Sequence, residues 1–177
     1  MIKYTCFPRT MAPPAFAKDI ADVFRAHQKE IDTEVLAQGL TSDEVLASLR
    51  KDLEALGFLV EAGKRKRDKI HRPVLFGENG NAVLKYEVDA YHPEWRCGLE
   101  VEAGRAWMGN AVYRDLIQAM VMVEVDYLIL AVSNSYKYKS SGRQLVSRDY
   151  DHTFSVADTL FSHNRVSLPY SLMLVGY

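Results

Sequence analysis

Hydrophobic residues recur at helical spacing in several parts of the chain. The strongest repeat is in residues 41–56, where Val45 and Leu49 belong to a stripe of apolar side chains along one side of a helix. Residues 41–44 read Thr-Ser-Asp-Glu, a capping box in which the first and last side chains bond otherwise unpaired backbone amides. Gly57 follows and can adopt the left-handed conformation that often ends a helix. These signals predict a helix over residues 41–56.

Three further helices are predicted mainly from periodicity. Residues 106–124 carry mostly apolar side chains and predict a heavily buried helix. Residues 15–31 predict another helix, which follows an arm that ends in two prolines and cannot itself be helical. A short helix is predicted at residues 155–161.

Two apolar runs predict strands within a sheet. Residues 97–103 alternate between apolar side chains and the acids Glu100 and Glu102, as in a strand with two different faces. Residues 127–132 are apolar without alternation, which is typical of a central strand covered on both faces. A β-hairpin is predicted from residues 74–76, a turn at residues 77–80 and residues 83–91, and further strands are predicted at residues 58–60 and 171–175.

The order of these elements predicts an α/β fold, a mixed β-sheet flanked by helices. The chain has 177 residues, 48% of them hydrophobic, which suits one globular domain over residues 1–177. Within it we expect a core at about residues 41–133, an N-terminal helical arm at residues 1–40 and a C-terminal extension at residues 134–177.

Net charge and cysteine content indicate which partners and which cellular compartment suit the protein. The formal net charge is −1, so any polyanion would have to be met by a local patch of positive charge. Two cysteines do not indicate a disulfide scaffold. The sequence shows no signal peptide and no run of about 18 apolar residues, so we expect a cytoplasmic protein without a membrane span.

Two segments concentrate positive charge. Residues 64–72 contain six Lys or Arg residues and one acid, and residues 136–143 are predicted to form a basic loop with tyrosines. Such runs are often solvated loops, but they are also typical of segments that contact phosphates. The candidate DNA-binding residues are Lys64, Arg65, Lys66, Arg67, Lys69, Arg72, Lys137, Lys139 and Arg143.

Three carboxylates are expected to lie close together. Glu100 and Glu102 share one face of their strand, and Asp89 lies beside them if the preceding strand pairs with this one. Two unit charges ~4 Å apart repel by about 1 kcal/mol even in water. A divalent cation would relieve this repulsion, and ligands that are all oxygen favour Mg²⁺ or Mn²⁺. The alternative is that the two glutamates form the solvated face of an edge strand.

A line of polar residues is expected on the helix that follows. Asn110, Arg114 and Gln118 recur every four residues and therefore share one side of the helix, and Arg105 stands just before it. Donors that face a carboxylate cluster would suit the binding of phosphate and water. The alternatives are a helix with one solvated stripe, or an Arg114 that simply pairs with Asp115.

The acidic residues resemble the active-site motif of the PD-(D/E)xK nuclease superfamily. Asp89 is followed after ten residues by Glu100-Val101-Glu102, with Glu in the last position instead of Lys. This variant is most similar to the branch of type II restriction endonucleases typified by BamHI and BglII. The resemblance covers residues 41–133 and implies a restriction-endonuclease-like core with the element order αβββαβ.

The resemblance also implies a role for each acid. Asp89 and Glu100 would bind Mg²⁺ or Mn²⁺ together with the backbone carbonyl of Val101, and Glu102 would orient or activate the attacking water. Glu44 or Glu54, on the preceding helix, would add a further acid.

The implied function is Mg²⁺-dependent hydrolysis of double-stranded DNA by a homodimeric endonuclease. Two alternatives stay open from the residues alone. One is a catalytically inactive nuclease-like module that binds nucleic acid or a protein partner, and the other is a structural α/β domain whose acids are all solvated.

Overall fold

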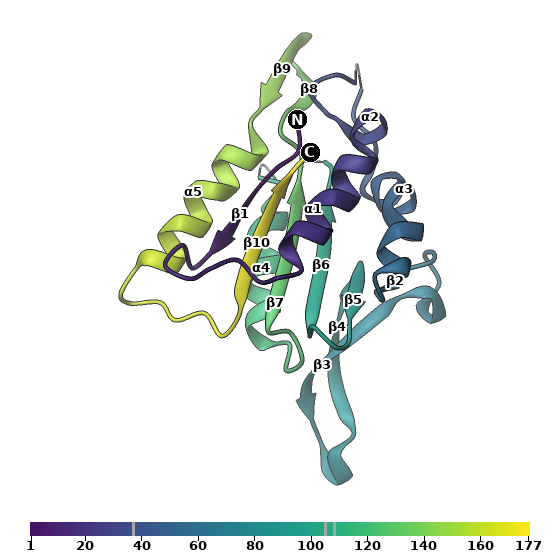
Figure 1. Cartoon of the computed structure of the whole chain (residues 1–177), viewed down its shortest axis with the longest axis vertical. Coiled ribbons are helices and arrows are strands. Elements are labelled where there is room, and N and C mark those ends of the chain that lie inside the picture. Colours follow the sequence, from purple (N-terminus) through teal and green to yellow (C-terminus); the bar gives the residue numbers. More distant parts are fainter. Residues whose placement is uncertain (37, 105, 108) are drawn as a thin grey trace.

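A six-stranded mixed β-sheet forms the centre of the protein (Figure 1). The computed structural model describes residues 1–36, 38–104, 106–107 and 109–177. In spatial order the strands are β1 (Lys3–Phe7), β10 (Ser171–Gly176), β7 (Tyr127–Val132), β6 (Cys97–Glu102), β5 (Ala90–His92) and β2 (Leu59–Val60). Strands β10, β7 and β6 are parallel to one another, whereas β1, β5 and β2 each pair antiparallel to their neighbours.

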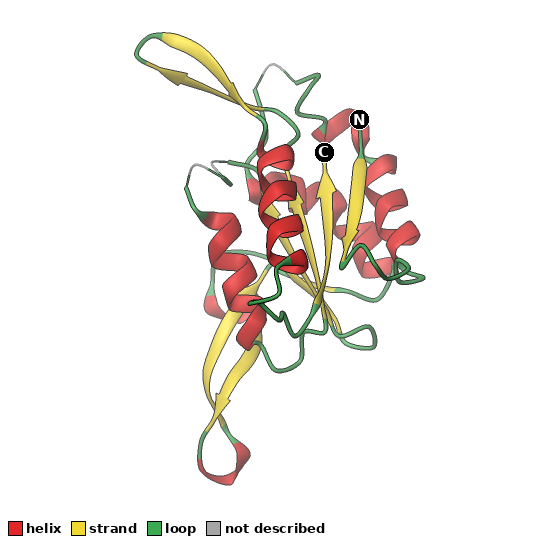
Figure 2. Cartoon of the chain, turned by 90° about the vertical axis from the view of Figure 1, so that its left-hand side faces the viewer, coloured by secondary structure: helices red, strands yellow, loops and turns green. Residues whose placement is uncertain are grey.

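Helices cover both faces of this sheet (Figure 2). On one face lie α1 (Ala17–Ala26), α2 (Gln28–Ile31) and α3 (Ser42–Ala55). On the other lie α4 (Ala111–Val121) and α5 (Asp149–Ser162). The mixed α/β architecture predicted from the order of the elements is therefore confirmed. Within the described residues, no helix is both long enough and apolar enough to cross a membrane.

Along β6, apolar side chains point to one face of the sheet and acidic side chains to the other. Leu99 and Val101 belong to the apolar core under α1 and α3. Because successive side chains of a strand point to opposite faces, Glu100 and Glu102 are directed to the face that α4 covers. Strand β7 is buried along almost its whole length, as its unbroken apolar run predicts.

Two hairpins project from opposite ends of the molecule (Figures 1 and 2). One consists of β3 (Ile70–Phe76) and β4 (Ala82–Val88), with the short 3₁₀ helix η2 (Glu78–Gly80) at its tip and η1 (Lys66–Asp68) before it. The other consists of β8 (Tyr136–Ser140) and β9 (Arg143–Ser147). Residues 136–143, predicted to be a loop, are therefore mostly strand.

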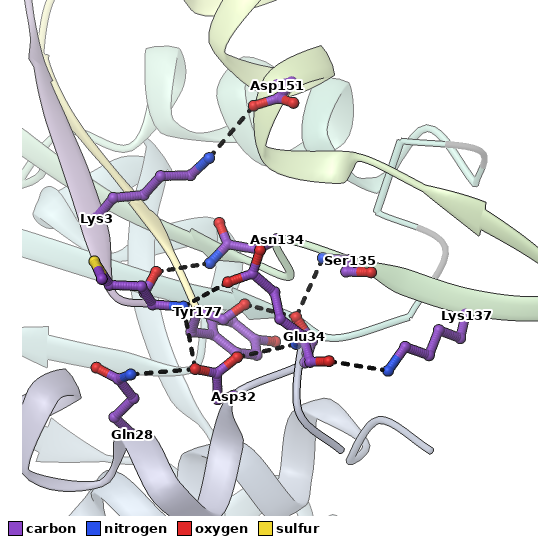
Figure 3. A network of polar contacts seen from close by, with 11 residues as sticks. Lys3, Gln28, Asp32, Glu34, Asn134, Ser135, Lys137, Asp151 and Tyr177 are labelled. Atoms are coloured by element: carbon purple, nitrogen blue, oxygen red, sulfur yellow. Dashed lines mark hydrogen bonds and ion pairs between the residues drawn. The ribbon is translucent and has the colours of Figure 1, made fainter. Parts of the chain in front are cut away.

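A polar network fixes the base of the β8–β9 hairpin (Figure 3). Lys137 Nζ donates to the carbonyl oxygens of Glu34 at 3.3 Å and Leu36 at 2.6 Å. Thr33 Oγ1 and the amide of Asn134 both donate to the carbonyl of Tyr177, each at 2.7 Å. The segment after α2, the end of β7 and the end of β10 are thus held together beside the hairpin.

Local signals in the sequence predict α3 well. Thr41 and Glu44 form both hydrogen bonds of the capping box, and Gly57 has a φ of 104°. Other boundaries differ from those predicted. The arm at residues 1–14 contains β1, residues 83–91 divide into β4 and β5, and the helix predicted from residue 106 begins only at Ala111.

Candidate active site

A cavity of about 450 Å³ lies between the β3–β4 hairpin, the end of β6 and α4. It lies on the face of the sheet to which the acids of β6 are directed. The residues that line it are mainly charged: Glu61, Lys69, Lys85, Tyr86, Glu87, Val88, Asp89, Glu100, Arg114, Asp115 and Gln118. We refer to it below as the acidic cavity.

Asp89 lies at the bend where β4 ends and β5 begins. The last residue pair between β5 and β6 is Ala90 with Leu99. The backbone of Val101 therefore lies beyond the end of β5. The Val101 amide instead donates to Asp89 Oδ2 at 2.8 Å. The pKa of Asp89 is raised to about 6, mainly by burial. The hydrogen bond from Val101 lowers this pKa, and the nearby charges of Glu61 and Glu102 raise it.

Glu100 is the most deeply buried of the predicted acids on β6, with 8% of its surface exposed. Burial raises its pKa well above the usual value, and the charges of Asp89, Asp115 and Glu102 act in the same direction. This carboxyl group is therefore close to several like charges, as the pattern of the sequence predicts.

Arg114 joins the remaining acids into a network. Its Nη2 donates to Glu102 Oε1 at 2.6 Å and lies 2.8 Å from Asp115 Oδ1. The side chain of Asp115 is fully buried, and its Oδ2 has no hydrogen-bond partner among the described residues. Burial, followed by the charge of Glu102, raises the pKa of Asp115 to about 8.

The supporting residues predicted from the sequence are only partly brought together. Arg114 and Gln118 line the acidic cavity. Asn110 is exposed and left-handed, with a φ of 60°, and it precedes α4, so it does not continue their line along the helix. Arg105 lies outside the described residues.

The acids predicted on α3 do not reach the cavity. Glu44 is exposed and is bound in the capping box with Thr41. Glu54 is exposed on the same helix. Because α3 packs on the face of the sheet opposite to α4, the structure does not bring either acid into the lining of the cavity.

Two other acids that are buried at the cavity were missed in the sequence. Glu61 follows the short strand β2 and has 6% of its surface exposed. Asp115 was considered only as a partner of Arg114. Neither acid lies in a pattern of its own, since each comes to the cavity through contacts between segments distant in sequence.

The donor atoms at the cavity are suitable for a hard divalent cation. Among the residues that the structure describes, no group of three His, Cys, Asp or Glu side chains is placed to hold a metal ion. Backbone or water oxygens would therefore have to complete a site based on Asp89 and Glu100. The Val101 carbonyl points to the same side of β6 as the amide that bonds Asp89, and carboxylate and carbonyl oxygens are the ligands that Mg²⁺ accepts.

The basic residues divide into paired and exposed groups. Lys64 lies 3.5 Å from Asp43, and Arg67 lies 3.6 Å from Asp68. Arg72 is bound at 2.8 Å to a carboxylate oxygen of Glu124 and stacks over a tyrosine ring. Lys69 pairs with Glu61, and Lys137 is bound to backbone carbonyls. The residues most open to solvent, without an ion pair within the described chain, are Arg65, Lys66, Lys139 and Arg143.

This arrangement of sheet and helices is a restriction-endonuclease-like fold. The crystal structure of restriction endonuclease BglII in complex with a DNA 16-mer superimposes with a TM-score of 0.54 and 14% sequence identity, over 99% of this chain and 75% of that chain. Free BglII gives a TM-score of 0.49 and 14% identity, over 99% and 78% of the two chains. No protein-family model and no curated protein sequence matches the chain.

Proposed function

We propose that the protein is a divalent-metal-dependent DNA endonuclease that hydrolyses phosphodiester bonds. The observation that carries this proposal is the meeting of Asp89 and Glu100 in one cavity, beside the backbone of Val101. The BglII complex supports it, because a protein of the same fold is a restriction endonuclease that binds DNA. Double-stranded DNA is accordingly the proposed substrate.

Asp89, Glu100 and the Val101 carbonyl would hold Mg²⁺ or Mn²⁺. When bound, the cation would polarise the phosphate and lower the pKa of a coordinated water. Burial raises the pKa of both acids, and the charge of Asp89 also raises that of Glu100. A cation bound by the two carboxylates would offset both effects.

Glu102 would orient the attacking water or accept its proton. Its side chain is 17% exposed and is held by Arg114, so the carboxylate has a defined position next to the cavity. The ion pair with Arg114 occupies one oxygen of Glu102, the proposed base. This favours a second candidate function, a nuclease-like module that binds DNA without cutting it. Binding of DNA without any cleavage would identify that module.

The first test is cleavage of plasmid DNA by the purified protein. We expect cutting with Mg²⁺ or Mn²⁺ and none with a chelator. Asp89→Ala and Glu100→Ala should abolish cutting because each removes a metal ligand, and Glu102→Ala should slow it by about 100-fold or more while DNA binding is retained.

The control for these variants is Glu54→Ala, which removes an exposed acid from the opposite face of the sheet and should cut at the wild-type rate. Cutting in chelator, or full activity of both Asp89→Ala and Glu100→Ala, would refute the proposed site. Circular dichroism of each variant shows whether the fold is retained.

A further inference from the structure

An ion pair between a buried glutamate and a partly exposed lysine forms one wall of the acidic cavity. Glu61 has 6% of its surface exposed, and its carboxylate binds Lys69 Nζ. The backbone of Glu61 is also fixed, because its amide donates to the carbonyl of Asp89 at 2.8 Å and its carbonyl accepts a hydrogen bond from Arg50. The glutamate is thus attached to the residue that would bind the metal.

Lys69 is directed to this wall and away from the charged segment that precedes it. Its side chain is 22% exposed, and Nζ lies 3.9 Å from Glu87 as well as next to Glu61. The charge of Lys69 is felt by Asp89, whose pKa it lowers. By contrast, Lys66 in the same segment is exposed to solvent. Residues 64–72 therefore supply two kinds of cation, one within the cavity and others on the surface.

The ion pair is not explained by stability alone. Removing two charges from water costs about as much as their attraction returns, and apolar residues often replace such pairs without loss. Among the described residues, Lys85 and Arg114 are the other two cations that line the cavity, and Arg114 already binds Glu102 and Asp115. Lys69 has three N–H donors, and Glu61 and Glu87 leave capacity for a further acceptor.

We propose that Lys69 is a catalytic residue that donates a hydrogen bond to a non-bridging oxygen of the phosphate being cleaved, and that Glu61 is the positioning residue that holds it there. The proposal rests on the proposed nuclease function. Lys69 would then act on the phosphate that is cleaved and would not be one of the residues that only bind the DNA backbone.

The step needs no additional reactant. The oxygen of a water molecule forms a bond to phosphorus and its proton passes to a base, while one P–O ester bond breaks and the leaving oxygen takes a proton from solvent. Lys69 stays protonated throughout. Its charge opposes the negative charge that increases on the phosphate oxygens in the transition state, which is where a fixed donor has most effect.

The test compares Lys69→Met with the matched control Lys51→Met, which removes an exposed lysine of α3 on the other face of the sheet. Two quantities are measured for each: the rate constant of cleavage with enzyme in excess over a DNA duplex in Mg²⁺, and the Kd for the same duplex in chelator. We expect Lys69→Met to cut about 100-fold more slowly or worse, with little change in Kd. Lys51→Met should retain both the rate constant and the Kd.

Additional variants separate catalysis from damage to the fold. Lys69→Arg should recover much of the rate, and Glu61→Gln should reduce it with DNA binding intact. Because Lys69→Met leaves a buried glutamate unpaired, the double variant Lys69→Met with Glu61→Gln removes both charges, and it should be folded and still slow.

The outcomes are distinct. If the wild-type protein cuts DNA and the double variant cuts equally fast, Lys69 is not catalytic, although the nuclease function stands. A Kd that rises in proportion to the loss of rate makes Lys69 a DNA-binding residue only. A wild-type protein that does not cut with any divalent cation overturns the proposed function and this inference with it.

Discussion

Asp89, Glu100 and Asp115 have raised pKa values, so their ionisation makes the folded protein less stable when no cation is bound. Asp115 illustrates the sign of the effect. Its pKa is raised from 3.8 to about 8 in the folded protein, so the folded state keeps a proton that the unfolded chain releases. The free energy of unfolding therefore decreases as the pH rises from about 4 to about 8, and this decrease is absent below about pH 4.

We predict that Asp115→Asn raises the melting temperature at pH 8 in chelator, because the substitution removes a buried charge and keeps an oxygen for Arg114. A gain of about 1 kcal/mol corresponds to about 2–4 °C for a chain of this size. The gain should disappear as the pH is lowered towards 4, which thermal melts at several pH values would show. A gain that is the same at every pH would contradict the raised pKa of Asp115.

Glu100→Gln provides the comparison. It should also stabilise the metal-free protein, but it should abolish the stabilisation that Mg²⁺ or Mn²⁺ gives to the wild type. Asp115→Asn should keep that response, since Asp115 is not a proposed ligand.

The sequence predicts best those helices and strands whose signals lie within the element itself. The capping box and apolar stripe of α3 and the unbroken apolar run of β7 lie within the elements themselves. Strand β1 has no comparable signal, because it is defined by pairing with β10 at the other end of the chain. The prediction of a loop at residues 136–143 overlooked a local signal, because residues 136–139 alternate between Tyr and Lys as a strand does and Ser141-Gly142 suits a turn.

The candidate site follows the same rule. Glu100 and Glu102 were predicted from the period of one strand, and Asp89 from its place before that strand. Glu61 follows the edge strand β2 and reaches the cavity through the pairing of β2 with β5. The left-handed turn at Asn110 starts α4 later than the periodicity indicates. Such contacts depend on the tertiary packing and leave no local pattern.

The β8–β9 hairpin leads to a prediction about DNA binding. Lys139 and Arg143 are exposed near its tip, whereas Lys137 is engaged at its base. Replacing Lys139 and Arg143 by alanine should weaken DNA binding and reduce the log–log salt slope by about two units, one for each phosphate contact.

Lys137→Met is the matched variant for this measurement. It should lower thermal stability by loosening the segment after α2, with a smaller change in the salt slope. Equal slopes for the wild type and the Lys139→Ala, Arg143→Ala variant, by fluorescence anisotropy, would exclude this hairpin as a DNA contact.

At the scale of the whole molecule, we predict that two copies act on one duplex. The chain carries one acidic cavity among its described residues, and one such site hydrolyses one strand, so a double-strand break needs two sites. Analytical ultracentrifugation with a short duplex should give a complex of two chains per DNA. A strictly monomeric complex that makes only nicks in plasmid DNA would contradict this prediction.

The position of β10 has a consequence for the time at which the protein becomes functional. Lys3 pairs with Gly176, so β1 can pair only after β10, much later in the sequence, has been synthesised. Pairing between such distant segments is slow, because a long loop must close before any contact compensates for it. Strand β6, which carries Glu100, is supported by β7, and β7 by β10. Synthesis itself would therefore delay the proposed cutting activity until residues 171–176 have been released.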